Sequence, residues 1–219
     1  SNKKVYAAGN ILDGTVVTID SFKSAFNGKV YYTKGLLKFA ENTETLGQSI
    51  ERLGTSSDPA VAANFNYFYQ FLMNAPALYD PYTQTLVGAP VGTLYTVFIP
   101  TNAAIMQAVK AGLLPGNTTT GVPTFSSASQ TAAQRQDVVD FIQYHIVQKN
   151  TIAVDGKKSG VFSTLLEDSN GDSKTVTVYY PAGNVPSQME VRDSHYVSGQ
   201  GATVNLAGSN NLANRALIR

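Results

Sequence analysis

The stretch that most constrains the fold is residues 94–109, where a strand pattern passes through a proline into a helix pattern. Residues 94–99 (LYTVFI) are rich in β-branched and aromatic side chains, which suit a buried, pleated surface. Pro100 has no backbone N–H for a ladder, so we expect the strand to end there. Thr101 or Asn102 can then cap a helix, which is worth about 1 kcal/mol.

The composition indicates a globular chain without an electrostatic preference for nucleic acid. The sequence has 219 residues, 43% of them hydrophobic, with a formal net charge of +1. A near-neutral chain lacks the excess of basic residues that would attract it to nucleic acid or to an acidic membrane. There are no cysteines, which excludes disulfides, thiolate metal sites and cysteine nucleophiles. No apolar run reaches the roughly 18 residues that a membrane helix needs.

Two motifs resemble those of one known family. Residues 96–105 (TVFIPTNAAI) resemble the first signature of fasciclin domains, and residues 138–147 (VVDFIQYHIV) resemble the family's Tyr-His helix and the strand after it. The resemblance covers roughly residues 60–219. It implies an α+β fold that is fasciclin-like, with two short-stranded β-sheets in a sandwich-like arrangement and several helices packed on one side.

A third motif lies near the start of the chain. Residues 27–37 (NGKVYYTKGLL) resemble the closing strand of a fasciclin domain, although Tyr31 stands where the family has histidine. We therefore predict that residues 1–40 are the closing strands of a preceding fasciclin-like repeat. An ordinary hairpin, turning at Asn27-Gly28, is the alternative.

The rest of the chain is expected to form one further domain. Residues 41–56 are polar and predict a linker, or a short helix around residues 46–53. Residues 57–219 are predicted to be a fasciclin-like domain that lacks its usual last strand, because residues 210–219 resemble only the approach to that strand. Our hypothesis is that residues 29–37, from the same chain or from a neighbour, occupy the open position in the sheet.

The two histidines are the first candidates for chemistry. In the family, the pair matching Tyr144 and His145 is partly buried and structural, and in some animal members it has been tied to integrin binding. We favour a core histidine that makes one or two hydrogen bonds. His195 is expected in a solvated turn.

Catalytic and cofactor sites find little support in the sequence. No G-x-S-x-G elbow is present, so a Ser-His-Asp hydrolase remains a remote alternative. A metal site of two histidines and a carboxylate would need His145 and His195 to converge. Residues 167–172 resemble a calcium loop only faintly, and the tip of a hairpin is the better interpretation. Residues 156–159 lack the spacing of a phosphate loop. We expect no catalytic residue, metal or cofactor.

Tyr79 and Tyr82 are the second candidates for a binding site. They flank Pro81 in a loop, and tyrosine offers a rigid face and a hydroxyl that suit a sugar or a protein contact. Two such rings exposed side by side in a groove would favour glycan binding. Burial in the core is the alternative.

The resemblance implies a non-enzymatic extracellular adhesion or protein-interaction module on a cell surface. Its partner would be a cell-surface or matrix protein, and strand exchange between chains is possible. The alternative is a glycan-binding accessory protein of a polysaccharide capture and uptake system. We expect an extracellular or surface location, such as an outer-membrane lipoprotein, with any membrane anchor outside this sequence.

Overall fold

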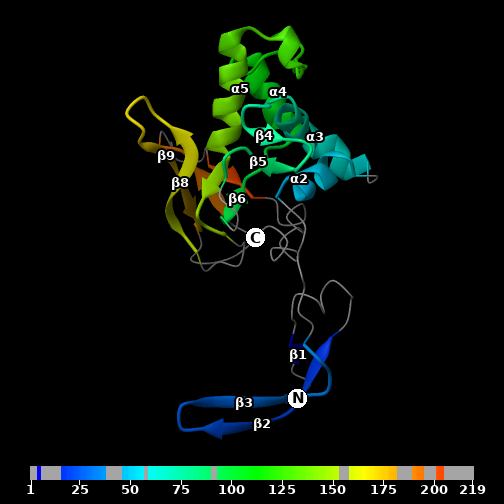
Figure 1. The fold of residues 1–219 in the computed structure, drawn as a ribbon, viewed down its shortest axis with the longest axis vertical. Helices are drawn as coiled ribbons and strands as arrows, with labels where there is room; N and C mark the ends of the chain where they lie inside the picture. The colour runs from blue at the N-terminus through cyan, green and yellow to red at the C-terminus, as the bar shows by residue number, and fades with distance from the viewer. Residues whose placement is uncertain are drawn as a thin grey trace.

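The computed structural model describes residues 4–5, 16–37, 46–56, 59–89, 93–152, 158–181, 189–194 and 201–204. These residues form a mixed α+β structure with four α-helices and three sheets, one of them a curled half-barrel. The expected α+β class is therefore confirmed. Figure 1 shows a body of helices and sheet, with a small N-terminal sheet apart from it.

The curled sheet is antiparallel throughout and has the order β11-β10-β9-β8-β7-β6. Its strands are β6 (Tyr95–Val97), β7 (Ile146–Gln148), β8 (Gly160–Glu167), β9 (Ser173–Tyr179), β10 (Glu190–Arg192) and β11 (Ala202–Thr203). An apolar cluster that is separate from the core between the helices covers one face of this sheet. It includes Phe162, Val176 and Val178. The predicted hairpin at residues 170–171 is confirmed, because β8 and β9 pair on either side of it.

The predicted passage from strand through proline to helix is also confirmed. Strand β6 is followed by one more backbone hydrogen bond, from the Phe98 N–H to the His145 carbonyl. After Pro100 the chain enters α4 (Asn102–Lys110), and the Thr101 hydroxyl accepts a hydrogen bond from the Ala104 N–H at 3.2 Å. The cap satisfies one of the backbone donors that a helix start leaves open.

The main core lies between the helices. They are α2 (Leu46–Gly54), α3 (Pro59–Met73), α4 and α5 (Ala132–Tyr144), with a short 3₁₀ turn at Ser127–Ser129 before α5. Phe65, Phe68, Phe71 and Leu72 recur at helical spacing, which predicts an apolar stripe on α3, and of these Phe68, Phe71 and Leu72 are fully buried. They pack in one cluster with Ile105 of α4 and Ile142 of α5. This burial holds the three helices together.

The segment expected as a linker contributes a helix to this core. Of the two interpretations of residues 41–56, the short helix is the one observed, because α2 packs against α3 with Ile50 buried. The Tyr69 hydroxyl of α3 donates to the Glu51 carboxylate at 3.3 Å. A small ribbon, β4 (Tyr79–Asp80) with β5 (Thr85–Leu86), packs against both α2 and α3. This segment is polar in overall composition, but a helix needs only one apolar face to pack against its neighbours.

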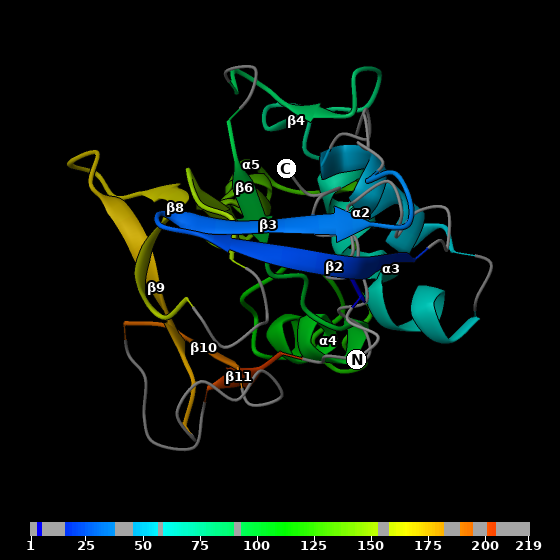
Figure 2. The same cartoon turned by 90° about the horizontal axis from the view of Figure 1, so that it is seen from below.

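The third sheet is formed by β1 (Lys4–Val5), β2 (Val17–Ala25) and β3 (Gly28–Thr33). Figure 1 shows this sheet below the body, and in Figure 2, the view from below, β2 and β3 lie across the front of it. In the described part of the chain, β3 pairs with β2 and not with the six-stranded sheet. Residues 29–37 therefore do not complete the sheet of their own chain, and that form of our hypothesis is wrong. Residues 205–219 lie outside the described residues.

We predict that Gly47→Ala destabilises the protein by about 1–3 kcal/mol, despite the better helix propensity of alanine. A Cβ atom at position 47 would overlap the Gln84 carbonyl and the Tyr79 hydroxyl, and would separate α2 from the β4–β5 ribbon. Urea unfolding of both proteins measures the difference. Gly28→Ala is the control, because no atom lies within 4 Å of its added Cβ. Unchanged stability in Gly47→Ala would contradict this packing of α2.

Candidate binding groove

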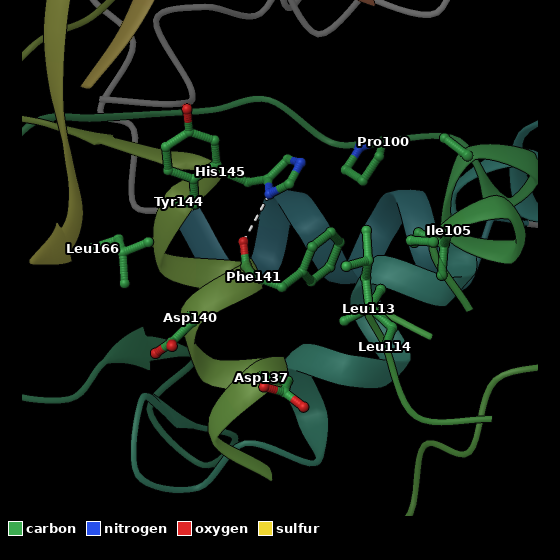
Figure 3. A pocket seen from close by; sticks show the side chains of 12 residues that line it. Pro100, Ile105, Leu113, Leu114, Asp137, Asp140, Phe141, Tyr144, His145 and Leu166 are labelled. Atoms are coloured by element: carbon green, nitrogen blue, oxygen red, sulfur yellow. Dashed lines mark hydrogen bonds between the residues drawn. The ribbon is translucent and has the colours of Figure 1, made fainter. Parts of the chain in front are cut away.

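The described surface has an open groove of about 500 Å³ between α4, α5 and the end of β8. Figure 3 shows its lining side chains. They are Pro100, Ala104, Ile105, Ala108, Leu113, Leu114, Asp137, Asp140, Phe141, Tyr144, His145 and Leu166. Most are apolar, so the groove is an outward continuation of the helical core.

The end of α4 builds one wall of the groove. Gly112 has a φ of +74°, which suits glycine, and it turns the chain out of the helix. The Gly112 N–H donates to the Val109 carbonyl, and the Leu113 N–H donates to the Ala108 carbonyl. This pair of bonds is a Schellman motif. It leaves Leu114 buried, whereas the Leu113 side chain is 68% exposed at the groove.

The opposite wall is α5, which adds the polar groups. Its start is fixed by a capping box between Thr131 and Gln134. One turn later, Asp137 and Asp140 follow at helical spacing, and both reach the groove. Asp140 accepts a hydrogen bond from Gln136 at 2.7 Å. Figure 3 shows both carboxylates at one edge of the apolar side chains between the helices. We call Ile105, Leu113, Leu114 and Phe141 the apolar floor, and Asp137 with Asp140 the acidic rim.

His145 closes the end of α5 and lies at the far end of the groove. Its Nδ1 lies 2.7 Å from the Phe141 carbonyl oxygen, so Nδ1 carries the proton and donates it. Its ring stacks against Phe141, with centroids 4.5 Å apart. Burial lowers the pKa of His145 below its ordinary value, and the imidazole is therefore neutral at pH 7.

Tyr144 ties α5 to the sheet. Its hydroxyl donates to the Thr175 carbonyl of β9 at 3.2 Å, and burial, followed by the nearby Asp193 carboxylate, raises its pKa. These contacts of Tyr144 and His145 are those of a structural pair, as we favoured from the sequence. The structure adds that both side chains also line the groove.

The structure does not bring Tyr79 and Tyr82 together as an exposed pair. Tyr79 is only 2% exposed and belongs to the helical core, whereas Tyr82 is 97% exposed in the turn after β4. Burial raises the pKa of Tyr79 to about 12. The Asp80 carboxylate, which accepts from the Tyr82 N–H at 2.8 Å, holds the turn. This loop therefore does not present the two exposed rings that would have favoured glycan binding, and core burial, the alternative, applies to Tyr79 alone.

The alternatives with catalytic or metal chemistry gain no support in the described residues. These contain no group of three or more His, Asp or Glu side chains placed to hold a metal ion. His145 is bonded to a backbone carbonyl rather than to a serine. His195 and residues 156–157 lie outside the described part.

The segment weighed as a calcium loop is the tip of the β8–β9 hairpin, as we preferred. The Asp168 carboxylate accepts hydrogen bonds from the N–H groups of Asn170 and Asp172 and pairs with Lys174 at 3.2 Å. These hydrogen bonds lower the pKa of Asp168. The chain's own donors thus occupy the carboxylate that a cation would need.

Sequence reasoning missed the groove itself. Leu113 and Leu114 follow a glycine that ends a helix, which predicts a turn but not which leucine stays exposed. In the sequence, Asp137 and Asp140 look like ordinary polar residues on the solvated face of a helix. Only the tertiary structure shows that the end of α4 lies beside them. The only sequence signal was the Tyr-His pair, which lies at one end of the groove.

Comparisons of this chain with protein-family models, with curated proteins and with solved structures find no match. In the part of the chain that the structure describes, every helix is too short or too polar to cross a membrane. The geometry of the groove therefore carries the functional argument.

We predict that acid weakens the folded state through His145. Because its pKa is lowered on folding, the unfolded chain binds more protons as the pH falls below about 6.5. This contribution to stability is complete above that pH and is lost toward acid, by at most about 1.4 kcal/mol per pH unit. Thermal or urea unfolding between pH 7.5 and pH 5 measures the slope.

The variant His145→Gln tests the assignment, since its amide can still donate to the Phe141 carbonyl but does not titrate. We expect a flatter pH dependence than that of the wild type. His195→Gln isolates any contribution of the second histidine. A slope that persists in His145→Gln and disappears in His195→Gln would contradict the prediction.

Proposed function

We propose that this chain is a non-enzymatic protein-interaction module of a cell surface, fasciclin-like in fold, which binds a protein segment in the groove between α4 and α5. The observation that carries the proposal is the exposed apolar floor of that groove beside an acidic rim. Isolated exposed leucines are common, but a concave apolar lining is typical of binding sites. The extracellular or surface location rests on the family resemblance.

The lining favours a peptide or a loop of a protein over a sugar. Leu113, Phe141 and Leu166 offer an apolar surface, and Asp137 with Asp140 offers two carboxylates at one edge. A segment with a large apolar side chain beside a lysine or arginine matches both features. A glycan site would instead present flat exposed aromatic rings together with several hydrogen-bonding groups.

One observation keeps the glycan-binding alternative open. Tyr82 is almost completely exposed, and the Asp80 carboxylate holds the backbone of its turn, so a single ring faces solvent. A single ring supports weaker stacking than two rings exposed side by side would. Glycan binding at Tyr82 is therefore the second candidate function, after protein binding in the groove.

We predict that Leu113→Glu abolishes binding of the chain to an immobilised panel of cell-surface and matrix proteins. A third carboxylate over the apolar floor would repel the acidic rim and leave a charge to be desolvated in the groove. Val161→Glu is the matched control, because Val161 is similarly exposed but does not line the groove. Equal binding by both variants would refute the groove as the site.

The same panel should carry polysaccharides, and Tyr82→Ala tests the second candidate. We expect Tyr82→Ala to leave protein binding unchanged. A glycan signal that is lost in Tyr82→Ala and kept in Leu113→Glu would transfer the proposal from the groove to the β4–β5 turn.

A further inference from the structure

The β2–β3 hairpin carries apolar side chains on both faces. Phe22 lies opposite Tyr31, with ring centroids 6.1 Å apart, and Val30 and Tyr32 alternate with Tyr31 onto the other face. All four are exposed. Of the side chains described in β2 and β3, only Val17 is buried.

A hairpin of this kind is not stable by itself. Two strands bury too little apolar surface in water unless a third strand or another element covers a face. Strand β1 covers two residues of β2 alone, at Val17 and Thr18. The rest of β2 and the outer edge of β3 are open in the described structure. Such edges and faces are places where another chain can bind.

The tip of the hairpin has a defined chemistry. Phe26 stands in the turn between β2 and β3 and is fully exposed. Lys23 and Lys29 come from the two strands beside it, and the Lys29 ammonium lies 5.6 Å from the Phe22 ring centroid. The one acidic residue of the hairpin, Asp20, is paired with Lys34 at 3.2 Å. The tip is therefore an aromatic side chain with one positive charge on each face of the hairpin, Lys29 on the face of Phe22 and Lys23 on the face of Val30.

This tip is the chemical complement of the groove. The groove offers an apolar floor at Leu113 and Phe141, and Asp137 with Asp140 offers two negative charges at its rim. We infer that the hairpin tip of one copy binds the groove of a second copy, with Phe26 on the apolar floor and Lys23 and Lys29 beside the two aspartates. The inference rests on the proposed function, because it names the occupant of the same groove.

The arrangement joins two copies rather than two parts of one chain. Figure 1 shows the hairpin at one end of the molecule and α4 and α5 at the other. Because the two surfaces differ, the contact is head-to-tail, and a pair of copies keeps one free groove on the copy that supplied its tip and one free tip on the other. Such contacts add copies in a row until a ring closes or a filament grows.

Analytical ultracentrifugation of the purified chain, from about 10 µM to about 1 mM, tests the inference. We expect the average mass of the wild type to rise with concentration beyond that of a dimer. Phe26→Ala and Leu113→Glu should each weaken association by about tenfold or more, because each removes one anchor of the contact. Circular dichroism checks that both variants keep the fold, which neither exposed position should affect.

A mixture of the two variants separates this contact from all symmetric ones. Phe26→Ala keeps its groove, and Leu113→Glu keeps its tip, so together they form one wild-type contact and stop at a 1:1 dimer. Self-association through paired hairpins would instead persist in Leu113→Glu alone. That result, or a mixture that stays monomeric while the wild type associates, would overturn the inference.

The charges supply an independent test. Lys23→Glu with Lys29→Glu should abolish association, and so should Asp137→Lys with Asp140→Lys. Mixing the two charge-reversed proteins should restore it, and added salt should weaken the wild-type contact. Failure of the mixture to associate would contradict the assigned pairing.

The protein panel described above distinguishes this inference from the proposed function. If Leu113→Glu loses a panel partner while Phe26→Ala keeps it, and the wild type stays monomeric, the groove binds a foreign segment and the inference fails alone. If Leu113→Glu changes neither panel binding nor self-association, both fail.

Discussion

The buried amide of Asn102 is the interaction on which the positions of the helices depend. Its Oδ1 accepts from the Tyr67 N–H at 3.0 Å, and its Nδ2 donates to Asn66 at 2.8 Å, so one side chain fixes the start of α4 against α3. A buried amide left without these partners would cost about 1–3 kcal/mol for each lost bond. Pro100 and the N-cap residue Thr101 set the position of the Asn102 side chain at the start of α4. Ile105, one turn later, then packs into the core.

The groove is a consequence of how α4 and α5 are each fixed at one end. Asn102 holds the start of α4, and the Schellman turn at Gly112 ends it. At the other wall, Tyr144 fixes the end of α5 to β9. Two helices tied at these points leave apolar side chains between them that no described element covers. Structural residues thus shape the groove without needing to be its principal contacts.

Sequence reasoning succeeded where structure follows from neighbouring residues. Proline ends a ladder and an apolar stripe at helical spacing finds a core, so the strand, the α4 cap and the burial of Phe68 and Phe71 were predictable. It failed where burial depends on distant partners. Tyr79 is buried because Gly47 lets α2 approach it closely, and no local pattern around Tyr79 indicates that approach. For the same reason, the groove could not be read from either of its walls alone.

The hairpin and the groove share one physical property, since each leaves apolar surface in water that no described element of its own chain covers. If the two surfaces were alike, they would favour a closed pair of copies. They differ in shape, one convex and one concave, and their nearby charges are opposite in sign. Dissimilar complementary surfaces at opposite ends of a molecule favour a row of copies over a closed pair.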